Sequence, residues 1–261
     1  MKISLSLYNF ILMAAHFGIA PLLFLPNWQP NVSGQSQLPS FAVVELFTSE
    51  GCSSCPPAEK YLNDLAAKAR AQNQKIYPLA FHVDYWNYLG WKDAFSDGRF
   101  SARQRGYADR ASTGRVYTPQ MIVNGEVAFV GSNRQQGEAA LTQALRQPAE
   151  VELHVQARHE HEQKKIMITY RIPAARPQSV LCVALVERGI RREIRSGENS
   201  GRVLHHDNVV RAFETVALQS PASGQIALPL PSGFALTNSA IITFVQDLKT
   251  NRIVGATSVD L

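Results

Sequence analysis

The stretch Glu45-Leu-Phe-Thr-Ser-Glu-Gly-Cys-Ser-Ser-Cys-Pro-Pro-Ala-Glu59 places a C-x-x-C motif between two different patterns. The apolar run 41–47 is typical of a buried strand, and the segment 58–70 carries apolar residues at helical spacing. The pair Pro56-Pro57 suits a helix start, because the N–H that proline lacks would have no partner there. The stretch therefore predicts two thiols, Cys52 and Cys55, at a turn from strand to helix.

This position suggests redox chemistry. We expect Cys52 to lie at the helix N-terminus, where unpaired backbone N–H groups and the macrodipole favour a thiolate over a thiol. The thiolate is the species that attacks disulfides. A third cysteine, Cys182, lies in the apolar run 179–186 and is expected to be a small buried residue of a strand.

Length and composition set the frame for this site. The chain has 261 residues, which favours two domains, and a hydrophobic content of 45% provides material for a core. The net charge of +5 arises from 26 basic and 21 acidic residues without a lysine or arginine block. We therefore expect a solvated surface and no nucleic-acid partner.

The N-terminus has the pattern of an export signal. Lys2 precedes a mainly apolar stretch, 10–25, and a polar segment, 26–39, follows. A helix of this apolar length spans roughly 24 Å, less than a hydrocarbon core of about 30 Å, which favours a cleaved signal over a membrane anchor. We predict that residues 1–39 are a signal peptide or N-terminal anchor plus linker. The protein would be periplasmic or secreted, with attachment to the inner membrane if the segment is retained.

Two kinds of pattern follow along the chain. Residues 40–148 read as strand, helix, strand, helix, hairpin and helix, with Asn124-Gly125 as the hairpin turn. Residues 149–261 show short alternating or apolar runs separated by Pro, Gly and Asn, which are typical of a β-sandwich. The predicted fold is an α/β N-terminal domain followed by an all-β sandwich-like C-terminal domain.

The order of elements in residues 41–147 resembles the thioredoxin fold, with C-x-x-C after the first strand and Thr118-Pro119 before the third. The resemblance implies a thioredoxin-like N-terminal domain with a cis proline packed against the dithiol. It also implies that Cys52 attacks, that Cys55 resolves, and that Thr118 and Pro119 hold an extended substrate.

Over nearly the whole mature chain, the sequence looks like an exported bacterial thioredoxin-like family of unknown function, domain of unknown function 1223. The stretches 45–59 and 197–211 carry this likeness. Gly51 and Ser53-Ser54 differ from the Trp-Cys-Gly-Pro-Cys of thioredoxins proper, so the direction of electron flow does not transfer. Glu45 lies near the place of the buried proton acceptor of thioredoxins, with an edge or surface carboxylate as the alternative.

An aromatic segment, 84–100, follows the second predicted strand. The first two strands of a β-α-β unit are parallel, so this segment should leave the sheet beside Cys52. We expect Trp86 and Trp91 to form part of a substrate groove or lid; packing at a domain interface is the alternative.

The predicted function is exported thiol–disulfide exchange with a protein partner, without a cofactor. The alternatives are a copper-binding protein and a non-catalytic interaction module with an inert disulfide. His82 could approach the dithiol and suit a Cu(I) site, but no second C-x-x-C accompanies the first, so we expect no metal. The remaining histidines, including His205 and His206, are expected to face solvent or cap loops.

Overall fold

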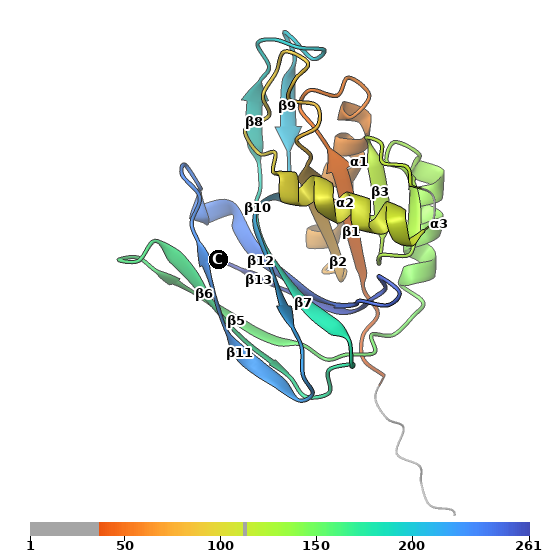
Figure 1. Cartoon of the computed structure of the whole chain (residues 1–261), viewed down its shortest axis with the longest axis vertical. Coiled ribbons are helices and arrows are strands. Elements are labelled where there is room, and N and C mark those ends of the chain that lie inside the picture. Colours follow the sequence, from red (N-terminus) through yellow and green to blue (C-terminus); the bar gives the residue numbers. More distant parts are fainter. Residues whose placement is uncertain (1–36, 112–113) are drawn as a thin grey trace, which may run out of the picture. The chain divides into compact units, whose positions relative to one another are not determined.

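A computed structural model describes residues 37–111 and 114–261 of the chain (Figure 1). The export signal predicted near the N-terminus falls mainly on residues 1–36, outside the described residues. No helix within the described ranges has the length and apolar character to cross a membrane. The helices and strands are β1 Ala42–Thr48, α1 Pro56–Ala71, β2 Ile76–His82, α2 Gly98–Arg110, β3 Gln120–Val123, β4 Val127–Val130, α3 Arg134–Ala144, β5 His154–Glu160, β6 Lys165–Ile172, β7 Ser179–Glu187, β8 Ile190–Glu193, β9 Val203–His206, β10 Val209–Ala217, β11 Ala222–Pro229, η1 Leu236–Asn238, β12 Ser239–Asp247 and β13 Ile253–Asp260.

One mixed sheet of eight strands runs through both halves of the chain, in the order β13-β12-β7-β10-β2-β1-β3-β4. The central strands β10, β2 and β1 are parallel, and the outer strands on both sides pair antiparallel. A three-stranded sheet, β11-β6-β5, and a two-stranded sheet, β8-β9, complete the strands.

The predicted thioredoxin-like domain followed by a separate β-sandwich is therefore wrong. The finding that overturns it is the pairing of β2 with β10, where Val209 lies opposite Ala80 and the Ala80 N–H donates to the Asn208 carbonyl at 2.9 Å. The physical reason lies in β2, which is buried along its whole length. Its second edge lies in an apolar interior, where polar backbone groups need partners. The start of β10 supplies them: Val209 pairs with Ala80, and the Asn208 side chain donates to the Pro78 carbonyl at 2.9 Å.

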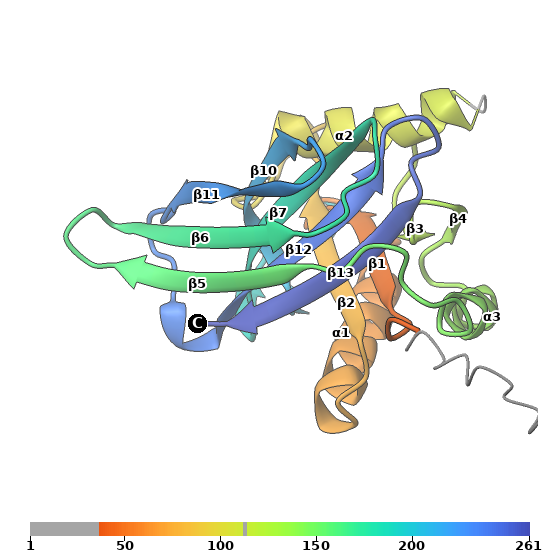
Figure 2. The ribbon, with the colours of Figure 1, turned by 90° about the horizontal axis from the view of Figure 1, so that it is seen from below.

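Three hydrophobic clusters hold helices and strands to this sheet. Helices α1 and α3 pack on one face of β1, β3 and β4, while α2 packs on the other face, across β1, β2, β10 and β7. Figure 2 shows α1 and α2 on opposite sides of the central strands. The three-stranded sheet packs on β7, β12 and β13 and encloses the third cluster.

Several local predictions are confirmed. Asn124 and Gly125 have φ values of 48° and 74° and form the turn between β3 and β4, a conformation that asparagine and glycine tolerate. Helix α1 buries Leu62 and Leu65 on its apolar stripe. Cys182 is a buried free cysteine in β7.

The β8-β9 hairpin lies against α1. Asn63 of α1 donates its side-chain N–H to the His205 carbonyl at 2.8 Å, and Arg70 pairs with Asp207 at 2.7 Å. This contact brings residues 190–207 of the C-terminal half beside the helix that follows the C-x-x-C motif.

Candidate functional site

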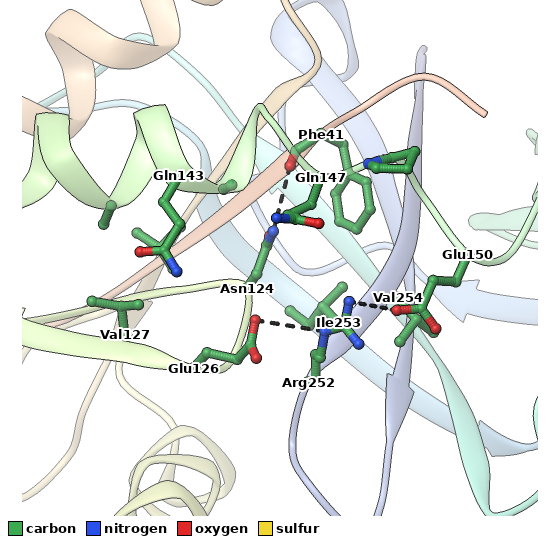
Figure 3. A pocket seen from close by; sticks show the side chains of 14 residues that line it. Phe41, Asn124, Glu126, Val127, Gln143, Gln147, Glu150, Arg252, Ile253 and Val254 are labelled. Carbon is green, nitrogen blue, oxygen red and sulfur yellow. Dashed lines mark hydrogen bonds and ion pairs between the residues drawn. The ribbon is translucent and has the colours of Figure 1, made fainter. Parts of the chain in front are cut away.

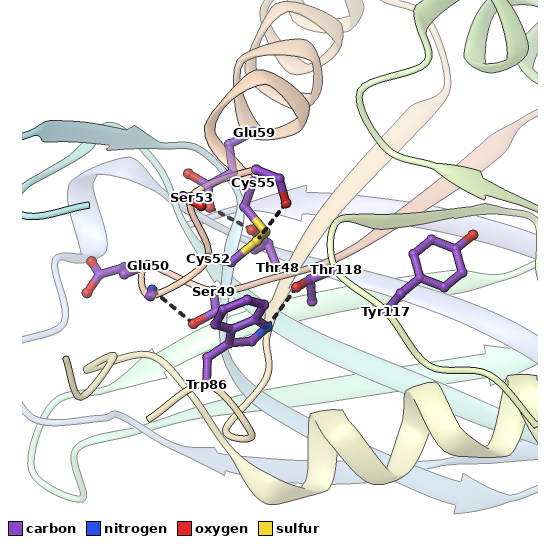
Figure 4. The surroundings of a disulfide bond; sticks show 12 residues. Thr48, Ser49, Glu50, Cys52, Ser53, Cys55, Glu59, Trp86, Tyr117 and Thr118 are labelled. Carbon is purple, nitrogen blue, oxygen red and sulfur yellow. Dashed lines mark hydrogen bonds between the residues drawn. A yellow bond between two sulfur atoms is a disulfide. The ribbon is translucent and has the colours of Figure 1, made fainter. Parts of the chain in front are cut away.

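Cys52 and Cys55 form a disulfide between β1 and α1 (Figure 4). Both cysteines are completely buried, whereas Ser53 and Ser54 between them are exposed. The Ser54 hydroxyl lies 3.3 Å from Cys52 Sγ. The predicted turn from strand to helix is thus present, with its serine edge outward and its sulfur atoms inward.

The helix N-terminus differs in one respect from the prediction. Cys55, not Cys52, occupies the N-cap position of α1. Pro56 and Pro57 have no N–H, and the N–H groups of Ala58 and Glu59 donate to the Cys55 carbonyl. Residues 56–59 therefore provide no unpaired N–H group for a thiolate, and the helix macrodipole is the remaining source of thiolate stabilisation at this end of α1.

Trp86 and Thr118 lie beside the disulfide, as predicted for Trp86 from the path of the aromatic segment. Trp86 Nε1 donates to Thr118 Oγ1 at 2.7 Å, and Trp86 packs on Gly51, where a Cβ would lie 3.4 Å from Trp86 Cβ. The Thr118–Pro119 peptide bond is cis, as the resemblance implied. Figure 4 shows Trp86 and Thr118 on the side of Cys52, and Glu59 on the side of Cys55.

Trp91 occupies a different place from Trp86. Its Nε1 donates to Glu50 Oε2 at 2.9 Å. A Cβ added at Gly197, which has a φ of 74°, would lie only 2.9 Å from Trp91 Cβ. Trp91 therefore packs between the residues before the disulfide and a loop from the C-terminal half.

That loop, 194–202, clamps the C-x-x-C turn. Asn199 is buried and donates its side-chain N–H groups to the carbonyls of Glu50 at 2.8 Å and Cys52 at 2.9 Å. Glu198 accepts from the Ser53 N–H at 3.0 Å. The Ser53 side chain and this N–H lower the pKa of Glu198. The dithiol turn is thus fixed by the half of the chain that sequence reasoning assigned to a separate domain.

Behind the disulfide lies a buried group of ionisable residues, Glu50, Glu59, His82, Asp93 and His206, which we call the Glu59 cluster. His82 Nδ1 lies 2.7 Å from Asp93 Oδ2. His206 lies between two carboxylates, with Nδ1 2.9 Å from Glu59 Oε2 and Nε2 3.3 Å from Glu50 Oε1. The cluster joins α1, β2 and β9 with the loops that carry Glu50 and Asp93.

The charges in this cluster shift each other's protonation. Burial by itself would lower the pKa of His206, but the Glu59 and Glu50 carboxylates raise it to about 10. Burial would raise the pKa of Glu59, but His206, His82 and the Thr48 hydroxyl lower it. Without another cation, His206 is thus protonated at neutral pH and Glu59 is ionised.

Glu45, the expected proton acceptor, lies elsewhere. Alternation along β1 places it on the face covered by α2, opposite α1. Its oxygens accept from Arg103 Nε at 2.6 Å and from the Tyr107 hydroxyl. The carboxylate that follows the disulfide by one helical turn is Glu59.

Sequence reasoning did not identify Glu59, His206 or Asn199. His206 was expected to face solvent or cap a loop, and this is wrong because it is buried against α1. The stretch 197–211, noted only for its family likeness, contains both Asn199 and His206. That likeness was the available signal that these residues accompany the C-x-x-C motif.

A small hollow at the start of β1 is separate from this site (Figure 3). Arg252 crosses it to pair with Glu126 and Glu150, and Asn124 Nδ2 donates to the Phe41 carbonyl. Its volume of about 50 Å³ admits a few water molecules at most. The disulfide follows the opposite end of β1, so this hollow takes no part in its chemistry.

Comparisons with known proteins identify a family and one solved structure of similar fold. The family model described as "Protein of unknown function (DUF1223)" matches residues 43–246. No curated protein matches the chain. A crystal structure of protein AGR_C_4864 from Agrobacterium tumefaciens is 26% identical, with a TM-score of 0.64, over 86% of this chain and 96% of that one. A domain of the outer membrane lipoprotein Omp28 from Porphyromonas gingivalis is 18% identical, with a TM-score of 0.30, over 43% of this chain and 96% of that one.

Proposed function

The chain belongs to the DUF1223 family of proteins of unknown function, and we propose that it performs thiol–disulfide exchange with a protein partner through Cys52 and Cys55. The observation that carries this proposal is the C-x-x-C disulfide at the N-cap of α1. The macrodipole of α1 favours a thiolate at this end of the helix, which makes a cysteine there a good leaving group.

From the disulfide form, exchange begins with a partner thiolate attacking Cys52 Sγ. A bond forms between the partner sulfur and Cys52, the Cys52–Cys55 bond breaks, and its electron pair remains on Cys55 as a thiolate. A second partner thiolate then attacks the partner sulfur and releases Cys52. The partner is oxidised to a disulfide and Cys52 and Cys55 are reduced; the reverse sequence reduces a partner disulfide.

Cys52 is the better candidate for attack because movable groups cover it. Trp86 and Thr118 lie on its side, and the exposed Ser53 and Ser54 form the outer edge of its turn. Cys55 is followed directly by α1 and the buried Glu59. Displacing Trp86 from Thr118 breaks one side-chain hydrogen bond, which is a small cost, about 1 kcal/mol.

A specific observation favours a rival function. Both cysteines have no exposed surface, which suits an inert disulfide that fixes the turn in a protein-interaction module. Reactive cysteines are normally partly accessible. The two proposals therefore differ in whether the turn opens while the protein remains folded.

Trapping of a mixed disulfide separates these functions. We expect Cys55→Ala to accumulate a covalent complex through Cys52 with proteins of the exported fraction, because the resolving thiol is absent. Cys52→Ala is the matched control, since it retains a thiol in the same turn and should trap at least tenfold less. Equal or absent trapping by both variants would favour the inert disulfide. Copper bound in proportion to the reduced wild-type chain, and lost in both variants, would favour the copper carrier.

We also propose that the protein is exported to the periplasm or secreted. The support is the apolar stretch 10–25 and a disulfide, which persists in oxidising compartments. Fusion of residues 1–39 to a reporter that is active only after export tests this directly. Carbonate extraction of the full chain then separates a cleaved, released protein from an anchored one.

A further inference from the structure

Three buried side chains of the Glu59 cluster each present a metal-ligand atom at one point. Glu59 comes from α1, His82 ends β2 and His206 ends β9. One ligand atom from each lies within 4.8 Å of the other two, and all three residues are buried. Elements far apart in the sequence thus bring an imidazole pair and a carboxylate together.

His82 is oriented as a ligand would be. Its Nδ1 contacts Asp93 Oδ2, which also accepts the Glu50 N–H at 2.8 Å, while Asp93 Oδ1 accepts the Phe95 N–H. Its Nε2 is buried and has no hydrogen-bond partner among the described residues. A carboxylate on Nδ1 keeps the proton there and leaves the Nε2 lone pair free, which is the usual outer-shell arrangement of metal-binding histidines.

His206 has the same kind of arrangement on its other nitrogen. Its Nε2 faces Glu50, which Arg192 and Trp91 hold in place. Its Nδ1 faces Glu59 at 2.9 Å. In the described part of the chain neither nitrogen has a contact with hydrogen-bond geometry.

The three buried carboxylates of the cluster also favour a bound cation. Within the described residues, the carboxylates of Glu50, Glu59 and Asp93 share one guanidinium, that of Arg192, which pairs with Glu50. The remaining compensation of their charge falls to the imidazoles of His82 and His206. Phe95 packs on both histidine rings and helps to exclude water. A buried site of this charge is stabilised either by two protons on the histidines or by one divalent ion.

We propose that Glu59, His82 and His206 bind a divalent transition-metal ion of the zinc class behind the disulfide. Imidazole nitrogen and carboxylate oxygen are typical zinc ligands, with bond lengths of about 2.0–2.2 Å, so ligand atoms around one ion lie roughly 3–4 Å apart. The observed spacing requires only a small closure. The ion would fasten α1, β2 and β9 together and support the dithiol turn. This inference does not rest on the proposed exchange reaction.

Zinc content tests the proposal. The full chain is saturated with Zn²⁺ alone, freed of excess ion by gel filtration, and analysed by mass spectrometry of the metal. We expect one equivalent per chain, and the same in a Cys52→Ser/Cys55→Ser variant. His82→Gln and Glu59→Gln should each lower the affinity at least tenfold, whereas His205→Gln, which changes the exposed neighbouring histidine, should not.

Folding is measured in parallel, because the cluster variants could lose stability. Wild-type protein should gain several degrees in Tm with Zn²⁺, and His82→Gln should gain none. A folded wild-type chain that retains no zinc and shows no rise in Tm would overturn the proposal. Zinc lost in the cysteine variant but retained in His82→Gln would overturn it as well, by assigning the ion to the thiols.

Discussion

Two buried carboxylates, Glu45 and Glu59, lie in opposite environments on the two faces of the sheet. Glu45 belongs to a cluster with Arg103, Tyr107 and Gln246, which we call the Glu45 cluster. Arg103 donates to Glu45 Oε1 and to Gln246 Oε1, and Gln246 Nε2 donates to the Tyr107 hydroxyl at 2.9 Å. Burial raises the pKa of Tyr107, so its hydroxyl stays protonated and donates to Glu45.

The Glu59 cluster lacks such a complete set of hydrogen-bond and charge partners. Among the described residues, its three carboxylates share one guanidinium and depend on the imidazoles for the rest of their charge compensation. His82 Nε2 and both nitrogens of His206 lack a contact with hydrogen-bond geometry there. A balanced buried cluster serves packing and stability, whereas an unbalanced one next to a disulfide has capacity for a ligand. On our proposal, this difference distinguishes a structural carboxylate, Glu45, from a metal ligand, Glu59, although the two residues are 0% and 4% exposed.

The comparison predicts its largest effect at Glu45. Glu45→Gln leaves the Arg103 guanidinium buried without its carboxylate, and removal of one partner of a buried ion pair costs about 3 kcal/mol. Urea denaturation measures this loss of unfolding free energy. The native-state rate of disulfide reduction by glutathione should not change. Glu126→Gln, at a half-exposed pair with Arg252, is the control and should cost under about 1 kcal/mol.

Asn199→Ala should affect both stability and the disulfide. It removes two hydrogen bonds to carbonyls of the dithiol turn, at a cost of about 2 kcal/mol in unfolding free energy. The turn then opens more readily, so reduction of Cys52–Cys55 by glutathione should accelerate about tenfold. Ser200→Ala, an exposed neighbour, provides the baseline. A lower unfolding free energy with an unchanged rate of disulfide reduction would show that the Asn199 hydrogen bonds do not control opening of the turn.

Trp86→Phe tests whether the Trp86–Thr118 hydrogen bond limits access to Cys52. The variant keeps the ring on Gly51 but removes the hydrogen bond to Thr118, so stability should fall by about 1 kcal/mol or less. Disulfide reduction should accelerate about threefold, since the cover is displaced more easily. Trp91→Phe loses a hydrogen bond to Glu50 instead, and serves as the matched aromatic control. Identical rates in both variants would show that Trp86 is packing only.

Glu198→Gln should give the smallest effect. Its carboxylate is ionised at neutral pH and accepts the Ser53 N–H, one residue after Cys52. Loss of this charge favours the Cys52 thiolate, so alkylation of the reduced protein at mildly acid pH should quicken about twofold. Glu193→Gln on the same hairpin should leave the alkylation rate unchanged. A slower reaction of Glu198→Gln would mean that positioning of the turn outweighs charge.

Local features of the fold could be predicted from the sequence. Helix α1 follows from its apolar stripe, and the turn at Asn124-Gly125 from residues that tolerate positive φ. The sequence did not predict that both halves join into one sheet, because a single residue pair, Val209 and Ala80, connects β10 to β2. Pro78 shortens that ladder, since it offers no N–H to the neighbouring strand.

One signal for the larger sheet was present in the chain. The run 180–186 is apolar without alternation, and β7 is buried on both faces between α2 and the three-stranded sheet. Strands of a two-layer sandwich alternate, whereas a strand covered on both faces reads as a continuous apolar run. For the site, C-x-x-C located the disulfide, but Asn199 and His206 approach it only through the tertiary fold.

The most direct test of the account measures whether the Cys52–Cys55 disulfide reacts in the folded protein. Reduction by glutathione is followed in water and in low urea, and its rate is compared with the rate of global unfolding. Exchange through a locally opened turn predicts reduction at least tenfold faster than unfolding, with little dependence on urea. Reduction that is no faster than unfolding and rises with urea in parallel would contradict thiol–disulfide exchange at this site and identify an inert structural bond.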